Sequence, residues 1–198
     1  FSGQGQRLAM MSKLILAVLQ MCTVKYSKLS LVINRLVKVS SNFKRIQRFM
    51  KSYRFCQRGF VKFAWSHYGN KGQWVALTMD RTNWKFGQVN INILAIGISW
   101  RGSAIPLVWK LLDKRGNSSV AERIELLDKL LELLSPKAVQ KIRYVLMDRE
   151  FGTKEWITAL KERNLDFVIR IRTDARVRKA GEHKEIAAKK LFASRKYR

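Results

Sequence analysis

Acidic residues are absent from the first 79 residues of the chain. That segment holds 14 Lys or Arg, whereas residues 80–198 hold 26 basic and 14 acidic residues, and the whole chain of 198 residues has a formal charge of +26. Such an excess of positive charge repels itself unless a polyanion is bound. Nucleic acid supplies one through phosphate contacts and counterion release, and a membrane surface is the competing polyanion.

Cysteines and long apolar runs are also scarce. Cys22 and Cys56 belong to no CxxC pair and lie at no zinc-site spacing, so a reducing cytoplasm is expected. The longest apolar stretch near the start, residues 14–19, is too short to span about 30 Å of hydrocarbon. It resembles a secretory signal after Arg7, but Lys13 interrupts it and no small-residue cleavage site follows. These absences leave nucleic acid as the expected partner and exclude a membrane.

The N-terminal part has the pattern of a small, basic, all-helical region. Apolar residues recur at helical spacing over 8–19 and 29–36, and a third segment, 43–51, has one apolar and one basic face after the capping residues of 40–42. A short helix, a tight connection and a basic helix are typical of a helix-turn-helix, whose second helix reads the major groove. The alternative is a helical bundle with a solvated or phosphate-contacting face. The predicted DNA-binding side chains are Asn42, Lys44, Arg45, Gln47, Arg48 and Lys51.

A change of pattern near residue 70 predicts two domains. Residues 57–73 are rich in glycine and asparagine, which indicates a connection. The sequence therefore predicts a helical DNA-binding domain at 1–70 and a second domain at 71–198.

The second domain reads as a mixed α/β (α+β) fold. Strand-like runs at 74–79, 90–100 and 104–109 are joined by short links and predict an antiparallel meander. Strands and helices then alternate, which predicts a mixed sheet with flanking helices, and a right-handed crossover would place the fourth strand beside the first. The later predicted elements are a helix at 120–134, a strand at 143–147, a helix at 153–163 and a strand at 166–171.

Two aspartates each close an apolar strand-like run. Asp80 follows residues 74–79 and Asp148 follows residues 144–147, so both are expected at the rim of the sheet, where they reach solvent. Pairing of these strands would bring the two carboxylates together, and such a pair can hold a divalent cation for phosphodiester chemistry. The alternative is that each carboxylate caps a turn or pairs with an arginine.

Several local sequences together resemble the DDE transposases of bacterial insertion sequences, in the cut-and-paste branch with a ribonuclease H-like catalytic domain. The segments that carry this resemblance are residues 40–49, 80–87, 90–94, 106–107, 111–118, 148–152 and 167–172. The resemblance covers most of the chain.

The resemblance implies a catalytic triad of two aspartates and one glutamate that holds two Mg²⁺ or Mn²⁺ ions. Asp80 matches the first acid and Asp148 the second. The family's glutamate lies in a later motif of Tyr, Arg, Glu and Lys that this sequence does not contain, so the chain is expected to be truncated before it and inactive alone. Glu150 is a substitute third ligand or, alternatively, the partner of a nearby base.

Further basic and aromatic residues lie close in sequence to the two aspartates. Arg81, Lys85, Arg149 and Lys154 are predicted to contact phosphates around the scissile bond, with surface solvation as the alternative. Trp84 either stacks on a base or packs against the sheet.

These observations predict a metal-dependent transposase that binds double-stranded DNA at terminal inverted repeats and at a target. The resemblance further implies a homodimer on paired ends and a location in the bacterial cytoplasm, at the nucleoid. Two alternatives stay open: a non-catalytic DNA-binding remnant that competes with intact transposase, and a related metal nuclease that acts on RNA or branched DNA.

Overall fold

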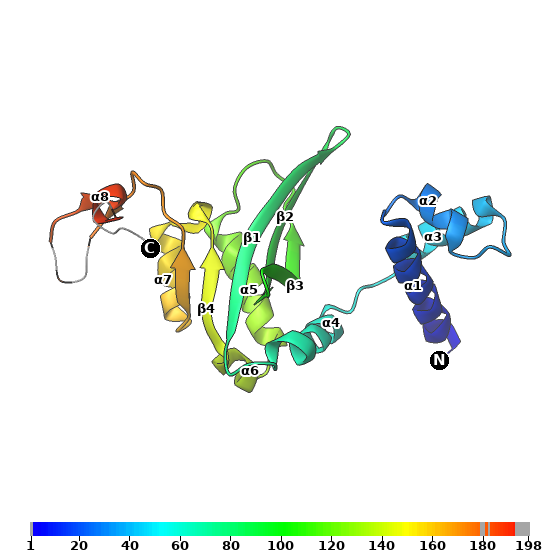
Figure 1. The fold of residues 1–198 in the computed structure, drawn as a ribbon, viewed down its shortest axis with the longest axis horizontal. Helices are drawn as coiled ribbons and strands as arrows, with labels where there is room; N and C mark the ends of the chain where they lie inside the picture. Colours follow the sequence, from blue (N-terminus) through cyan, green and yellow to red (C-terminus); the bar gives the residue numbers. More distant parts are fainter. Residues whose placement is uncertain (1, 179–180, 182, 193–198) are drawn as a thin grey trace. The chain divides into compact units, whose positions relative to one another are not determined.

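The computed structural model describes residues 2–178, 181 and 183–192 and divides the chain into two compact units, Phe1–Phe55 and Cys56–Arg198. The first unit contains α1 (Ser2–Met21), α2 (Tyr26–Val32) and α3 (Val39–Ser52), drawn in blue to cyan in Figure 1. The three predicted helices are confirmed, although the second ends four residues earlier than predicted. The small core of the first unit consists of Leu14, Ala17, Leu29, Ile33, Ile46 and Phe49.

Within the described residues, no single helix is long and apolar enough to cross a membrane. The segments Gly5–Met21 and Tyr26–Val32 reach that length and composition only as a pair bent by 103°.

The boundary between the two compact units lies after residue 55, 15 residues before the predicted domain boundary at residue 70. Residues expected to form a connection form α4 (Gln57–Ala64) and a π-helical turn (Trp65–Gly69). Val61 and Trp65 are buried in the core of the second unit, which holds this segment there. A Cβ atom on Gly69 would lie 2.6 Å from the Trp65 ring, so this glycine permits close packing and does not mark a linker.

The second unit is built on a five-stranded mixed sheet of order β3-β2-β1-β4-β5. The first three strands form the predicted antiparallel meander, and β4 and β5 are parallel to β1. The β2–β3 pairing shifts register between Ile96 and Gly97, and a Cβ atom on Gly97 would lie 2.5 Å from the Ile105 carbonyl oxygen. The strands are β1 (Val75–Phe86), β2 (Val89–Trp100), β3 (Ser103–Leu111), β4 (Ile142–Met147) and β5 (Asp166–Ile169).

Helices cover one face of this sheet. α5 (Val120–Leu133) and α7 (Lys154–Glu162) lie behind it in Figure 1 and bury Leu127 and Trp156 in the main core. On the other face, the Val168 side chain of β5 is 55% exposed. The predicted α/β class is therefore confirmed. The remaining elements are α6 (Pro136–Gln140), a 3-10 turn (Arg149–Phe151), the short strands β6 (Arg176–Val177) and β7 (Ile186–Ala187), and α8 (Ala188–Phe192).

Candidate active site

The two aspartates lie at the point where β4 ends beside β1. Met79 pairs with Met147 in the last parallel pair of these strands, and Asp80 and Asp148 follow directly. β1 itself continues to Phe86, paired with β2, so Asp80 lies inside the strand and the expectation that it ends the strand is wrong. The site is at the end of β4, where β1 loses one of its two neighbours.

Both aspartates belong to the same, less covered face of the sheet. Side chains alternate along a strand, so Asp80 shares its face with Thr78, and Asp148 continues the alternation from Leu146. All four line one hollow of about 400 Å³, together with Val168 and Arg170. The predicted approach of the two strand segments is thus confirmed.

The carboxylate oxygens have few competing partners. Asp80 Oδ1 accepts a hydrogen bond from the Arg81 backbone N–H at 2.7 Å, and Asp148 Oδ1 lies 3.7 Å from Arg170 Nη1. Carboxylate oxygens are hard ligands, and Mg²⁺ is commonly held by one or two of them while it keeps several waters. The pair therefore suits one divalent ion. No group of three or more His, Cys, Asp or Glu suited to a metal occurs within the part of the chain that the structure describes.

Glu150 is held by Arg81. Arg81 Nε donates to both Glu150 carboxylate oxygens at 3.2 Å, and Arg81 Nη2 donates to Glu150 Oε2 at 3.0 Å. The same guanidinium donates to the side-chain oxygens of Asn92 at 3.3 Å and Asn117 at 3.2 Å. Of the two readings of Glu150, the structure favours the ion pair. Arg81, predicted to contact phosphate, has a side chain that is only 13% exposed and is engaged in this network.

Arg123 is a structural residue of the site that the sequence analysis missed. It is 2% exposed, and its Nε donates to Ser118 Oγ at 2.8 Å while Nη2 donates to the Glu150 backbone oxygen at 3.3 Å. Its guanidinium lies 4.7 Å from the Phe151 ring centroid. Burial lowers the pKa of Arg123, and the charge of Glu150 acts in the opposite direction. The sequence signal that could have revealed its burial was its position among the apolar residues of α5.

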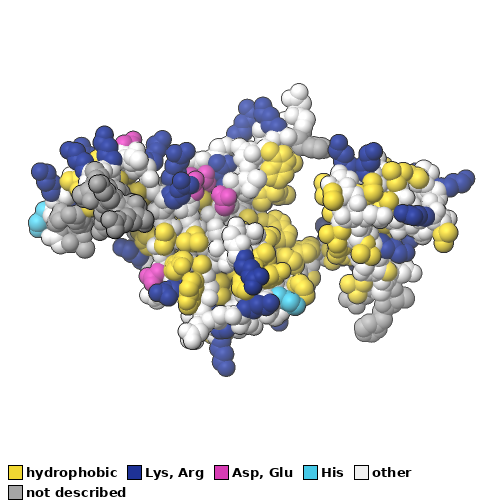
Figure 2. Space-filling model, in the orientation of Figure 1, with side chains coloured by type: hydrophobic (Ala, Val, Ile, Leu, Met, Phe, Trp, Pro, Cys, Tyr) yellow, Lys and Arg dark blue, Asp and Glu magenta, His cyan; other side chains and the backbone are white. Residues whose placement is uncertain are grey.

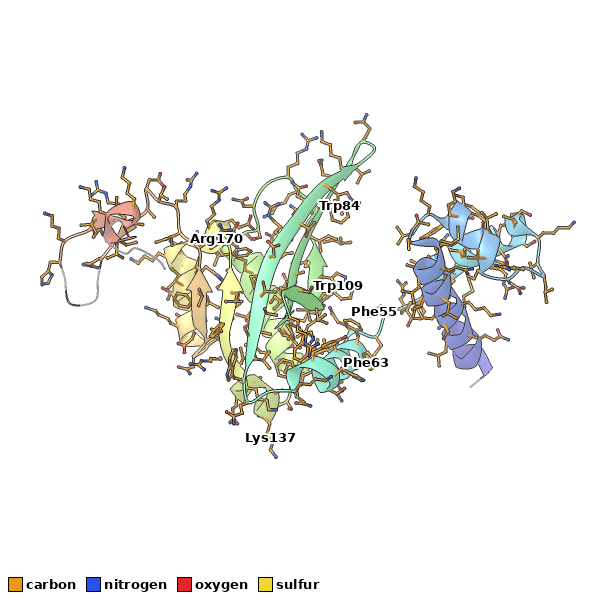
Figure 3. All side chains as sticks on the ribbon, viewed as in Figure 1. Phe55, Phe63, Trp84, Trp109, Lys137 and Arg170 are labelled. Carbon is orange, nitrogen blue, oxygen red and sulfur yellow. The ribbon has the colours of Figure 1, made fainter. Side chains whose placement is uncertain are left out.

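The other predicted phosphate-binding residues are spread over a wide area. Arg149 lines a hollow with Asp148. Lys85 lies five residues beyond Asp80 on extended β1, a rise of about 17 Å. Contrary to the expectation, it does not lie beside the aspartates. Lys154 is exposed at the first residue of α7. Trp84, labelled in Figure 3, is 44% exposed on the same extension as Lys85.

In the N-terminal unit, α3 exposes most of the predicted DNA-binding side chains. Lys44, Arg45, Gln47, Arg48 and Lys51 are all exposed.

Asn42 is the exception on this helix. It is 1% exposed, and its Nδ2 donates to the backbone oxygens of Asn34 at 2.7 Å and Ser30 at 3.1 Å. The expectation that Asn42 contacts DNA is contradicted, because its side chain holds the connection between α2 and α3. The predicted capping run also lies inside the helix, whose N-cap is Lys38 without a side-chain bond.

The sheet order, the covering helices and the paired aspartates define an α/β protein with a ribonuclease H-like fold. Residues 110–198 match the family model described as "Transposase DDE domain". The comparison with curated proteins finds no match.

Solved structures similar to the chain include transposases and a viral integration complex. The Mos1 transposase catalytic domain with Raltegravir and Mn is 16% identical over 56% of this chain and 57% of its own, with a TM-score of 0.37. A Mos1 paired-end complex with the left transposon end is 12% identical over 79% and 57%, with a TM-score of 0.32. A simian T-cell lymphotropic virus intasome is 11% identical over 76% and 53%, with a TM-score of 0.39. The chain thus spans little more than half the length of these chains.

Proposed function

We propose that the chain supplies the DNA-binding helices and the first two metal-binding acids of a DDE transposase, which binds the ends of a mobile element and cleaves and rejoins DNA. The observation that carries this proposal is that Asp80 and Asp148, 68 residues apart in sequence, line one hollow beside the end of β4. Double-stranded DNA is the substrate, a homodimer on paired ends the working form, and a bacterial cytoplasm the location.

The residues of the site have distinct tasks in this proposal. Asp80 and Asp148 hold the divalent ion, which when bound stabilises the charge on the attacking and leaving oxygens of the phosphodiester. Arg149 contacts the DNA backbone beside Asp148. The Arg81–Glu150 pair positions the turn after Asp148, and the exposed basic face of α3 holds the duplex.

Metal binding tests the central observation. Titration of the full chain with Mn²⁺, followed by electron paramagnetic resonance of the free ion, should reveal a site whose affinity falls at least ~10-fold in Asp80→Asn and in Asp148→Asn. Asp113→Asn, which removes an equal charge from an exposed position, is the matched control. Equal affinities in all four proteins would refute the shared site.

DNA cleavage tests the reaction itself. With Mn²⁺ and a duplex bearing the element's ends, any strand nicking by the wild-type chain should disappear in either aspartate variant. If the chain binds such a duplex with sequence preference but neither wild type nor variants cleave it, the second candidate is favoured: a DNA-binding protein that competes with intact transposase. The observation behind that candidate is the two-acid site, for which the described residues offer no third metal-binding side chain.

A further inference from the structure

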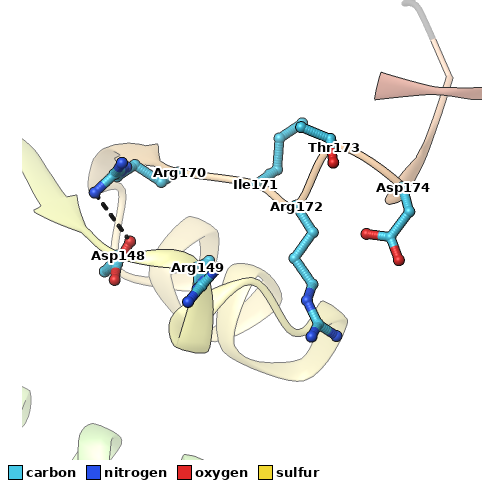
Figure 4. A pocket seen from close by; sticks show the side chains of 7 residues that line it. All are labelled: Asp148, Arg149, Arg170, Ile171, Arg172, Thr173 and Asp174. Atoms are coloured by element: carbon cyan, nitrogen blue, oxygen red, sulfur yellow. Dashed lines mark ion pairs between the residues drawn. The ribbon is translucent and has the colours of Figure 1, made fainter. Parts of the chain in front are cut away.

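Arginines gather around Asp148. Three hollows, of about 640, 400 and 480 Å³, share Asp148 as a lining residue. Arg149 and Arg172 together line the hollows of about 640 and 480 Å³. Arg170 lines the hollows of about 640 and 400 Å³. Figure 4 shows the three guanidinium groups around the largest hollow, with Arg170 directed toward Asp148. The largest hollow, called the groove below, thus adjoins the hollow of the aspartate pair at Asp148 and is otherwise lined by residues 149 and 170–174.

The backbone of this loop is fixed at both ends. Arg170 N–H donates to the Met147 carbonyl oxygen at 3.0 Å, which continues the β4–β5 pairing past the end of β5. Ala175 N–H donates to the Arg172 carbonyl oxygen at 3.1 Å, and Lys189 N–H donates to the Thr173 carbonyl oxygen at 2.9 Å. The arginine side chains therefore extend from a backbone held in one position.

The arginine side chains themselves are available for a ligand. The Arg170 side chain is 83% exposed, and its ion pair with Asp148, at 3.7 Å, is too long for a hydrogen bond and contributes little. Arg149 and Arg172 are exposed and make no side-chain hydrogen bond or ion pair to any residue that the structure describes. The lining of the largest hollow contains two acids, Asp148 and Asp174, and three arginines, so this hollow keeps an excess of positive charge.

Guanidinium groups in this arrangement match phosphate oxygens. The planar fork of arginine forms paired hydrogen bonds to phosphate, and backbone phosphates fix the register of a nucleic acid strand on a protein. The groove shares Asp148 and Arg170 with the hollow of the aspartate pair, which suits a strand that runs past both and not a small enclosed anion.

We propose that Arg170 and Arg172 form a phosphate clamp for the DNA strand, which binds the backbone phosphates next to the one placed at Asp80 and Asp148. This inference rests on the proposed function and extends it to the path of the DNA.

The salt dependence of DNA binding tests the clamp. The full chain is titrated with a labelled short DNA duplex in EDTA, by fluorescence anisotropy at several salt concentrations. For Arg170→Gln/Arg172→Gln, the slope of log K against log salt should be less steep by about two, because each lost phosphate contact reduces the magnitude of the slope by about 0.9. Arg170→Lys/Arg172→Lys should retain the wild-type slope, since lysine still pairs with phosphate as a point charge.

A matched control removes two charges elsewhere. Lys129 and Lys137 are exposed on α5 and α6, and Figure 3 shows Lys137 at the end of the sheet opposite Arg170. Lys129→Gln/Lys137→Gln should change the slope by less than half as much as the arginine pair. Circular dichroism confirms that each variant is folded.

The outcomes separate the clamp from the proposed function. A slope for the arginine pair equal to that of wild type or of the lysine control would overturn the clamp, as would a slope change seen with duplex RNA but not with DNA. A reduced slope supports it, even where the Mn²⁺ titration shows no site at Asp80 and Asp148. In that case the proposed function fails and the clamp stands, because the binding assay contains no metal.

Discussion

At the scale of single residues, the site depends on contacts between side chains that are far apart in sequence. Arg81 and Glu150 are 69 residues apart, yet the guanidinium holds both carboxylate oxygens. Asn92 supports Arg81 from β2 and also donates to the backbone oxygens of Lys114 at 3.0 Å and Gly116 at 3.1 Å. One network thus joins β1, β2, the loop before α5 and the turn after Asp148.

Replacement of Glu150 tests this network. Glu150→Gln should lower the free energy of unfolding by about 2 kcal/mol, between the values for exposed and buried ion pairs, because it leaves the charge of Arg81 without compensation. Chemical denaturation measures the change. Glu155→Gln, an exposed acid of α7, is the control for loss of one negative charge from a basic chain.

A double variant completes this experiment. In Arg81→Gln/Glu150→Gln the loss should be smaller than the sum of the two single losses, because neither charge is left alone. Additive losses would show that the pair does not couple.

The residue scale also marks the limit of what the sequence allowed. The apolar runs before Asp80 and Asp148 predicted the acid pair, because a carboxylate that follows a buried strand-like run lies where it can reach solvent. The burial of Asn42 and the pairing of Glu150 with Arg81 could not be predicted in the same way. Both depend on which atoms face the side chain in the folded protein, and the neighbouring residues in sequence do not determine those contacts.

At the scale of elements, periodicity predicted most of the second unit. The meander, the crossover helix and the position of β4 beside β1 followed from alternation, turn residues and the handedness of the crossover. The extension of β1 to Phe86 did not follow, since its residues after Asp80 are polar and are paired only with β2. α4 was missed because Gly59 inside it resembles a breaker, while the packing of Val61, and of Trp65 just after it, on the core keeps the segment helical.

The N-terminus of α5 lies next to the site and is closed by a capping box. Glu122 N–H donates to Ser119 Oγ at 3.2 Å, and Ser119 N–H donates to Glu122 Oε2 at 2.6 Å. Lys114 Nζ lies 2.7 Å from the same carboxylate oxygen. Burial alone raises the pKa of Glu122, but the bonds from Lys114 and Ser119 outweigh it, so the pKa lies below its ordinary value.

This shift predicts a pH-dependent contribution to stability. A carboxyl whose pKa is lower in the folded state stabilises the fold above its unfolded pKa of about 4.3, and the contribution is lost as the pH falls through the folded value. Glu122→Gln keeps the cap bond but not the ion pair, so it should cost about 0.5–1 kcal/mol at pH 7 and less near pH 3, below the unfolded pKa.

Urea denaturation at both pH values measures the difference for Glu122→Gln. The control is Glu132→Gln at the other end of α5, where loss of a negative charge near the helix C-terminus should not destabilise the protein. A cost for Glu122→Gln that is the same at both pH values would contradict the ionic origin of the effect.

At the scale of the whole molecule, the two units differ in how they balance charge. Residues 1–55 contain 11 Lys or Arg and no acid, so this unit has no internal ion pair of side chains and depends on its small apolar core. The second unit contains all 14 acids and forms ion pairs around its sheet. An acid-free unit is stabilised by a bound polyanion, which agrees with a role in holding DNA.

The separate cores predict two unfolding transitions with different sensitivities. Ile46 is fully buried among residues of the first unit, and Leu127 is fully buried among residues of the second. Ile46→Ala and Leu127→Ala should each destabilise their own unit by about 2–5 kcal/mol, because a buried aliphatic side chain is replaced by a cavity. Scanning calorimetry should show one transition lowered in Ile46→Ala and the other in Leu127→Ala. Added short duplex DNA should raise the transition that Ile46→Ala lowers, and a single transition lowered equally by both substitutions would show that the chain unfolds as one cooperative body.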